Sequence, residues 1–577
     1  MRQPSSRRKP SPHTFRALTR AVSALGTTTA LLALTTTGVQ AAAPASPAGR
    51  GESDLALASV QADTAAEQQA LAATGLDIIE ADDKHAEVLL HSPDDHVALA
   101  AGGWTYRTES VDDDLATLDG ARAAEAAAAA AGEKSTLPTG RVAYRDLGTI
   151  NTELKALAKR YPKQVKLFRL PHTTLLGKTV YGVEVTGDVH EYAGKPEFLL
   201  TGVHHAREWP TAELTTEFIT EAVTSYGTDD RFTHLMDSSR IVVVPVVNAD
   251  GYDVSRSRIN EMKRKNCRVT PGLVPTAADC EDPANANSGV DPNRNYGAFW
   301  GGPGSTTNLL ASDHHGSAPY SEPEIENMRE LVNAHQFTVA INAHTPDERL
   351  LRAPSSPLEP DPVEEDLYQS LAESLGSDLG GWPSGPWPEV YYNASGTAEE
   401  HAFYTSGTFA FTPELMPGFN GLLRFHPPYE YVADQYWGTG IYQGSSAREA
   451  FLHAWEMSTD PALHSVIKGK APKNIELHIT KDVTLKSSPT PVADGGTIPT
   501  DQHLESTIKV SDDGTFTWNV NPSVRQSQDA SRLLQESWTI SCLNPAGKVM
   551  HSEQVTVTRG ASAMVNMSEC PGGPKRH

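Results

Sequence analysis

Three residues with metal-binding side chains stand directly after apolar segments of the sequence. His205 and Glu208 follow the segment 198–203, and His344 follows the segment 337–341. Two histidines and a glutamate are a ligand set that holds a catalytic zinc ion while one position stays open for water. Zinc held in this way makes its water a good nucleophile near neutral pH and polarises a carbonyl group. The spacing therefore predicts one zinc ion bound by these three side chains.

Two neighbouring histidines compete for the first ligand position. Successive residues of a strand point in opposite directions, so only one of His204 and His205 can face the metal. The two-residue interval before Glu208 favours His205. We interpret His204 as a structural histidine.

Glu414 follows a further apolar segment, 408–412. A carboxylate at this place can act as the general base that activates the zinc water. A solvated loop glutamate has the same local sequence, and from position alone that is the more common interpretation.

The elements that must position these residues lie within residues 142–460, the predicted catalytic domain. Helical patterns such as 149–161 and 212–226 alternate with near-continuous apolar segments. Such strands are typical of a mostly parallel (mixed) sheet of an α/β domain with helices on both faces. Ligands bind such sheets beyond the carboxyl ends of the strands, which is where the candidate residues stand. The predicted strands are 198–203, 241–247, 337–341 and 408–412.

The N-terminal part has the pattern of a secreted precursor. Basic residues, an apolar run and then small residues predict a signal peptide over residues 1–41. The pattern of residues 58–112 predicts a small α/β prodomain. Residues 113–141 are predicted to be a linker with basic residues that proteases could cleave. A small unit joined to a larger domain by a cleavable linker indicates a propeptide. An ordinary N-terminal accessory domain is nearly as compatible with the pattern.

The C-terminal residues 470–577 alternate apolar and polar side chains, which predicts an antiparallel β-sandwich. The segment shows no catalytic cluster. It is either a module that binds cell wall or polysaccharide, or a stabilising appendage.

Charge and cysteine content limit the function classes. The net charge of −24 excludes the basic surface that nucleic-acid binding requires. No stretch after the signal peptide is long and apolar enough to predict membrane insertion. Four cysteines suit an extracellular protein, and their spacing is too wide for a zinc–thiolate cluster. The simplest of three pairings joins Cys267 to Cys280 and Cys542 to Cys570.

Eight motifs in this order resemble the funnelin zinc metallocarboxypeptidases of the carboxypeptidase A/B type. The resemblance covers roughly residues 142–430. It implies a zinc exopeptidase, made as a zymogen, that removes one C-terminal amino acid from peptides or proteins. The motifs are His205-Ala-Arg-Glu-Trp209, Asn248-Ala-Asp-Gly-Tyr252, Arg264-Lys-Asn266, Asp291-Pro-Asn-Arg-Asn295, Ser321-Glu-Pro-Glu324, Asn342-Ala-His344, Tyr392-Asn-Ala-Ser-Gly396 and Thr408-Phe-Ala-Phe-Thr-Pro-Glu-Leu415.

The resemblance also implies roles for single residues. His205, Glu208 and His344 match the zinc ligands of the family, and Glu414 matches its general acid/base. The residues implied to bind substrate are Arg264 at the scissile carbonyl, Asn293 and Arg294 at the terminal carboxylate, Tyr392 as the mobile tyrosine that closes over it, and Arg207 in the neighbouring subsite.

The physical chemistry of arginine agrees with these roles. A planar guanidinium group can bind a carboxylate through two parallel hydrogen bonds, which explains why Arg294 would select a free C-terminus. A second cation near the tetrahedral intermediate adds stabilisation. Lys263 replaces the tryptophan that usually precedes the family's arginine, and this leaves a one-residue shift of the Arg264 assignment open.

Glu399 matches the residue at the floor of the family's specificity pocket. An acidic residue there marks preference for C-terminal Lys or Arg, because a buried carboxylate pairs with a basic side chain. The alternative is that Glu399 and Glu400 are a solvent-facing pair on a helix surface.

Two other functions remain to be compared. A zinc amidase or deacylase of the same fold, acting on cell-wall peptides or acyl amino acids, would not need the residues that bind an α-carboxylate. A non-catalytic binding protein predicts loss of Glu414 or of a zinc ligand, and all four residues are present.

Overall fold

The structure is a computed structural model that describes residues 55–81, 84–191 and 194–571. The predicted signal peptide, residues 1–41, lies outside the described residues. No helix within the described ranges is long and apolar enough to span a membrane.

An eight-stranded mixed sheet forms the centre of the large domain, in the order β11-β10-β12-β9-β7-β8-β6-β5. The neighbours β12, β9, β7 and β8 are parallel, whereas β5–β6, β6–β8 and β10–β12 are antiparallel. The predicted mixed sheet is confirmed, and its parallel strands end at one edge. The strands are β5 (Val165–Thr173), β6 (Thr179–Val185), β7 (Glu197–Thr201), β8 (Arg240–Val244), β9 (Phe337–Asn342), β10 (Leu350–Arg352), β11 (Ser384–Pro386) and β12 (Phe409–Pro413).

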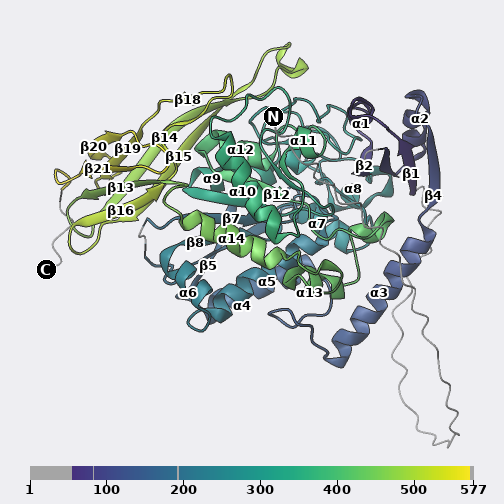
Figure 1. Cartoon of the computed structure of the whole chain (residues 1–577), viewed down its shortest axis with the longest axis horizontal. Helices are drawn as coiled ribbons and strands as arrows, with labels where there is room; N and C mark the ends of the chain where they lie inside the picture. Colours follow the sequence, from purple (N-terminus) through teal and green to yellow (C-terminus); the bar gives the residue numbers. More distant parts are fainter. Residues whose placement is uncertain (1–54, 82–83, 192–193, 572–577) are drawn as a thin grey trace, which may run out of the picture. The chain divides into compact units, whose positions relative to one another are not determined.

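Helices cover both sides of this sheet, which explains why its central strands are buried and mostly apolar. Figure 1 shows α9 and α12 on one side of the strands and α5 and α14 on the other. The helices are α4 (Leu147–Arg160), α5 (Trp209–Ser225), α6 (Asp230–Ser238), α7 (Ala249–Arg256), α8 (Ala277–Glu281), α9 (Pro323–Asn333), α10 (Glu365–Asp378), α11 (Trp387–Val390), α12 (Ala398–Ser406), α13 (Glu430–Trp437) and α14 (Ala447–Thr459).

The N-terminal unit is a four-stranded antiparallel sheet with two helices. Its strand order is β2-β3-β1-β4, and β1, which is not predicted from the sequence, pairs with both β3 and β4. Much of the predicted 113–141 linker is helical, because α3 spans Asp112–Ala131. The remaining elements are β1 (Ala56–Gln61), α1 (Ala65–Ala72), β2 (Asp77–Ala81), β3 (His85–Leu90), α2 (Pro93–Ala101) and β4 (Tyr106–Ser110).

The C-terminal part contains a three-stranded sheet, β16-β13-β21, and a four-stranded sheet, β15-β14-β19-β20. Its core includes Ile467, Ile479, Trp518 and Trp538. The arrangement is not wholly antiparallel as predicted, since β21 runs parallel to β13. A role in binding cell wall or polysaccharide stays a prediction. The strands are β13 (Ser465–Lys470), β14 (Glu476–Lys486), β15 (Pro499–Lys509), β16 (Thr515–Val520), β17 (Arg525–Gln526), β18 (Leu533–Leu534), β19 (Trp538–Leu543), β20 (Val549–Val555) and β21 (Ser562–Asn566).

Disulfides join Cys267 to Cys280 and Cys542 to Cys570, the two local pairs that the sequence favours. The first closes the loop that follows α7, and the second joins β19 to the segment after β21.

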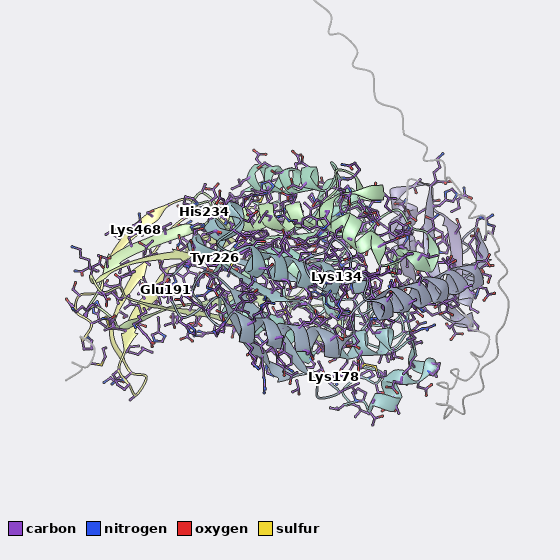
Figure 2. All side chains as sticks on the ribbon, turned by 90° about the horizontal axis from the view of Figure 1, so that it is seen from below. Lys134, Lys178, Glu191, Tyr226, His234 and Lys468 are labelled. Carbon is purple, nitrogen blue, oxygen red and sulfur yellow. A yellow bond between two sulfur atoms is a disulfide. The ribbon has the colours of Figure 1, made fainter. Side chains whose placement is uncertain are left out.

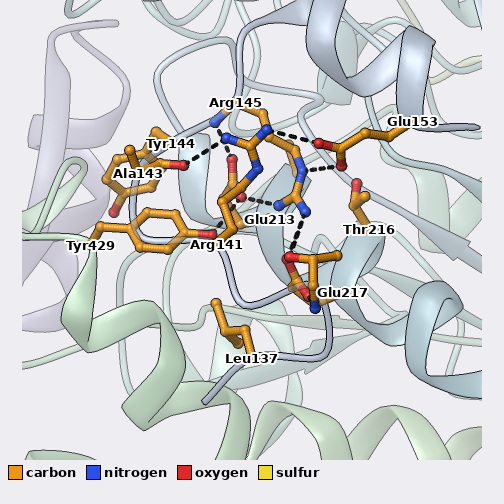
Figure 3. A network of polar contacts seen from close by, with 12 residues as sticks. Leu137, Arg141, Ala143, Tyr144, Arg145, Glu153, Glu213, Thr216, Glu217 and Tyr429 are labelled. Atoms are coloured by element: carbon orange, nitrogen blue, oxygen red, sulfur yellow. Dashed lines mark hydrogen bonds and ion pairs between the residues drawn. The ribbon is translucent and has the colours of Figure 1, made fainter. Parts of the chain in front are cut away.

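Arg145 anchors the beginning of the large domain to α5, the helix that follows the His205–Glu208 segment. Its buried guanidinium group contacts Glu213 and Glu217 of α5 and Glu153 of α4 (Figure 3). The Nη2 atom lies 2.6 Å from Oε1 of Glu217, and Nε lies 2.7 Å from Oε2 of Glu153. The network therefore fixes the helix that begins at the predicted metal site.

Replacing Arg145 by Met is expected to lower the free energy of unfolding by about 3–5 kcal/mol, because Glu213 and Glu217 would remain buried without their cation. Arg231→Met is the matched control. Its ion pairs with Glu449 and Glu456 are exposed, so the expected change is within about 1 kcal/mol. Chemical denaturation of both variants measures the difference, and equal losses would contradict this role for Arg145.

Candidate active site

Three buried side chains meet where β7 and β9 end. Nδ1 of His205 lies 2.6 Å from Oε1 of Glu208 and 3.0 Å from Nδ1 of His344. Nδ1 of His344 lies 3.1 Å from Oε2 of Glu208. The three predicted ligands thus present their donor atoms to one another.

The chemistry of these donors fits a zinc ion. Two imidazole nitrogens and a carboxylate oxygen within 4.8 Å of one another are the donor types that zinc prefers. Nε2 of His205 lies 3.1 Å from Oδ1 of Asp291, and such an outer carboxylate commonly orients a zinc-binding histidine. The backbone N–H of Thr345 donates to Oε2 of Glu208.

His204 does not join the ligand group. Its Nε2 lies 2.7 Å from the hydroxyl of Tyr296, and its side chain is fully buried. His204 is thus a structural histidine, as interpreted from the sequence, but both histidines lie in a bend after β7 ends at Thr201, so the alternation of strand residues is not the reason.

Glu414 lies beside His344 because β12 and β9 are parallel neighbours. The backbone N–H of His344 donates to the carbonyl of Pro413 (3.0 Å), and the N–H of Leu415 donates to the carbonyl of His344 (2.8 Å). The Glu414 side chain is buried, so it is not the solvated loop residue of the alternative interpretation. Burial, and then the nearby Glu208 carboxylate, raise the pKa of Glu414 well above its usual value.

Arg264 is the member of its basic triplet that contacts Asp291. Its Nη2 lies 2.8 Å from Oδ2 of that carboxylate. Lys263 donates instead to the carbonyl of Ser288, and Lys265 to carbonyls near residue 310. These contacts favour Arg264, and not Lys263 or Lys265, as the residue assigned to the scissile carbonyl.

The role of Asp291 is not predicted from the sequence. One of its oxygens contacts His205 and the other contacts Arg264, so it joins the metal site to the nearby cation. Burial acts against ionisation, but the neighbouring Arg264 and His205 keep its pKa well below the usual value. Its place at the start of the Asp-Pro-Asn-Arg-Asn motif was the available signal.

Asn293 and Arg294 lie in the short turn after Asp291. The amide oxygen of Asn293 accepts from the N–H of Ala398 (3.0 Å), and its buried amide nitrogen has no hydrogen-bond partner among the residues that the structure describes. Arg294 donates to the carbonyls of Gly304 and Asn293, both at 2.8 Å. A carboxylate placed here would accept from an amide donor that is otherwise unsatisfied.

A cavity of about 30 Å³ is lined by three of the predicted substrate-binding residues, Arg264, Arg294 and Tyr392, but not by Arg207, Asn293 or Glu399. Residues from the N-terminal unit close its other side. The large domain contributes Arg264, Arg294, Gly304, Ser312, Asp313, Tyr392 and Asn393, and the N-terminal unit contributes Ala72, Leu76, Asp77 and Ile78.

Glu399 is fully buried at the start of α12, as is Glu400. The alternative of a solvent-facing pair is therefore wrong. The Trp387 indole N–H donates to Oε1 of Glu399, and the hydroxyl of Thr412 donates to Oε2 (3.0 Å). Burial raises the pKa of Glu399. The Arg294 guanidinium lies 5.7 Å from the centre of the Trp387 ring, a neighbour that is not predicted from the sequence.

Arg207 points toward the N-terminal unit. Both terminal nitrogens of its guanidinium group bind the Asp77 carboxylate of β2, with one contact of 2.8 Å. The same group packs over the ring of Phe425, 4.1 Å from the ring centre. Nε2 of His91 lies 2.8 Å from the Asp77 carboxylate.

The chain is similar to known proteins. Residues 150–437 match the family model for zinc carboxypeptidase. Carboxypeptidase A2 of Mus musculus is 31% identical over 238 residues, which are 40% of this chain and 53% of that protein. Carboxypeptidase A4 of Mus musculus is 29% identical over 292 residues, 49% of this chain and 64% of that protein. The chain thus spans less than two thirds of these relatives.

The fold also resembles a solved structure. The crystal structure of the carboxypeptidase A from Helicoverpa armigera has a TM-score of 0.57 at 20% sequence identity. The match covers 70% of this chain and 98% of that chain. At this identity the likeness concerns the fold.

Proposed function

We infer a zinc-dependent exopeptidase from the membership of residues 150–437 in the zinc carboxypeptidase family. The enzyme would hydrolyse the C-terminal peptide bond of peptides and proteins. The observation that carries the proposal is the convergence of the His205, Glu208 and His344 donors beside Glu414, with Arg264 in contact with Asp291.

Each residue has a chemical task in this proposal. The zinc ion, when bound by the three donors, supplies a Lewis acid and a water of lowered pKa. The Glu414 carboxylate accepts a proton from water and returns it to the leaving amine. Arg294 and the amide of Asn293 bind the substrate carboxylate, and Tyr392 closes over it. Arg264 stabilises the negative charge that develops on the carbonyl oxygen.

A preference for C-terminal Lys or Arg belongs to the same proposal. Glu399 is buried, and its donors Trp387 and Thr412 are neutral. A basic side chain of the substrate would supply a cation for this carboxylate, which has none bonded to it in the described part of the chain.

The N-terminal unit is proposed to hold the enzyme inactive until the chain is cut. Asp77 forms an ion pair with Arg207, and Glu80 forms an ion pair with Arg424. The segment between α3 and the Arg145 network contains the exposed Lys134 (Figure 2), a site at which a protease specific for lysine could cleave.

Replacing Asp77 by Ala in the uncut chain is expected to raise its activity about tenfold or more. The variant removes a buried two-point ion pair with Arg207, a type of contact whose loss weakens association by about 2–5 kcal/mol. The cut enzyme should be unchanged. Asp63→Ala, at an exposed position of the same unit, is the control. Uncut wild type that is as active as the cut form would contradict the inhibitory role.

Export is proposed from the signal-like residues 1–41 and from the two disulfides, which persist in oxidising compartments. The mature enzyme would then act outside the cell.

The proposed activity is tested with chain cut after Lys134 and blocked dipeptides that end in Lys, Arg, Phe or Leu. Release of Lys and Arg, lost with a zinc chelator and restored by zinc, is the expected result. Release of Phe or Leu would keep the enzyme and remove the role of Glu399. Hydrolysis confined to substrates without a free carboxylate would favour the amidase.

A further inference from the structure

The hairpin of β14 and β15 in the C-terminal part has a buried end. The two strands pair along their whole length and are joined by residues 487–498. We call residues 486–490 the hairpin tip. Its polar residues Ser487, Ser488 and Thr490 are no more than 3% exposed. Connecting segments usually run over the surface in contact with water, so this burial indicates that the hairpin tip packs against another part of the protein.

The partner of the hairpin tip is the backbone of Phe299 and Trp300 in the large domain. The N–H of Phe299 donates to the carbonyl of Lys486 (2.9 Å), and the N–H of Ser488 donates to the carbonyl of Trp300 (3.0 Å). The Ser488 hydroxyl donates to the carbonyl of Phe299 (3.0 Å). Phe299 has a φ of 51°, which a bulky residue keeps only where its surroundings hold it. The hairpin tip therefore fixes a strained part of the large domain.

Segment 299–304 leads from this contact to Arg294. The segment is tightly folded, since the N–H of Gly302 donates to the carbonyl of Phe299 (3.1 Å). At its other end, the carbonyl of Gly304 accepts from Nε of Arg294 (2.8 Å), whose side chain is buried. A shift of the segment at the hairpin tip would therefore move the atom that orients the guanidinium group.

The opposite side of segment 299–304 packs against the residues that follow Tyr392. The Ser395 hydroxyl donates to a carbonyl of the segment, 2.7 Å away. Gly304 has a positive φ and lies so close to the backbone of Asn393 that a Cβ added to it would overlap the Asn393 carbonyl oxygen. The segment is thus enclosed between this backbone and the hairpin tip, and it cannot shift without moving one of them.

We propose that the hairpin tip positions Arg294 for the substrate carboxylate, with Ser488 as the positioning residue. The inference rests on the proposed function, because that function assigns the substrate carboxylate to Arg294. Ser488 fixes segment 299–304, and the Gly304 carbonyl of this segment fixes the direction of the guanidinium group. A binding group held in place before the substrate arrives loses little freedom on binding. The C-terminal part is then a component of the substrate site and not only a stabilising appendage.

Replacing Ser488 by Ala in the cut enzyme tests this role. The variant removes the hydroxyl bond to Phe299. We expect KM for a blocked dipeptide with a free carboxylate to rise about five- to tenfold, with kcat within about twofold, because a contact made both before and during the reaction affects binding alone. Thr484→Ala is the matched control. Its hydroxyl donates to Asp501 on the exposed side of the same hairpin, so KM should not change.

The same substitution in an Arg294→Met enzyme separates positioning from stability. If Ser488 acts through Arg294, Ser488→Ala should change KM by less than about twofold in that background. An equal rise of KM in both backgrounds would contradict the positioning role. A lower Tm of Ser488→Ala with unchanged KM would contradict it as well, since that result identifies a contact that only stabilises the fold.

Hydrogen exchange of the same variants gives a readout that does not need activity. Peptides covering residues 294–304 should exchange about tenfold faster in Ser488→Ala than in wild type or Thr484→Ala. Unchanged exchange would overturn the proposal that Ser488 fixes this segment. Faster exchange with unchanged KM would overturn the link to substrate binding. Wild type that releases no residue from any blocked dipeptide would instead reject the proposed function, and with it the role of Arg294, whatever the exchange shows.

Discussion

Replacing Glu414 by Gln in the cut enzyme is expected to lower kcat by about 10²- to 10⁴-fold. Gln has nearly the same shape but cannot accept a proton from water and return it to the leaving amine. Because Glu414 is not among the three donors, the bound zinc should stay at one ion per chain. Steady-state kinetics and metal analysis of the purified variant measure the two quantities.

Glu348→Gln is the matched control for this substitution. Glu348 is an exposed residue of the loop after His344, so its loss should leave kcat and zinc content unchanged. A Glu414→Gln enzyme with wild-type kcat would remove Glu414 from the chemistry. Loss of zinc from that variant would mean that the residue acts as a ligand.

Replacing Arg294 by Met is expected to lower kcat/KM by about 30-fold to several thousand-fold, the equivalent of losing a buried two-point ion pair. Arg294 lines the cavity that Arg264 and Tyr392 also line, and it follows Asn293, whose amide nitrogen has no hydrogen-bond partner among the described residues. Arg294→Lys keeps the charge but not the two-point geometry, so its loss should be intermediate. Kinetics with one blocked dipeptide compare the three enzymes.

The order of these three activities is the informative result. If Arg294→Lys and Arg294→Met lose activity equally, charge contributes little and planar geometry dominates. If neither variant loses activity, the substrate carboxylate binds elsewhere, and selection of a free C-terminus needs another residue.

The centre of the fold could be predicted because its strands are buried on both faces. β7, β9 and β12 are buried along their whole length and are mostly apolar, so they stand out from the helical pattern. β5 is only partly buried, and β10 is too short to show a pattern. α3 has an Ala-rich acidic composition that resembles a linker, and its contacts with the large domain are not visible in the sequence.

The site could be predicted where residue type and position after a strand sufficed. The contacts of His205, His344 and Glu414 follow from the parallel order of β7, β9 and β12. Contacts between distant segments could not be predicted. Asp77 lies 130 residues before Arg207, and no local pattern joins them. The Trp387 contact with Glu399 likewise depends on how the loop before α12 folds.

The most direct measurement uses two peptides of identical sequence, one with a free C-terminal carboxylate and one with a C-terminal amide. Cut enzyme is incubated with each, and mass spectrometry follows the products. We expect the free acid to lose one C-terminal residue and the amide to remain intact, because Arg294 and Asn293 need a carboxylate to bind. Equal cleavage of both peptides, or cleavage at an internal bond, would contradict a carboxypeptidase.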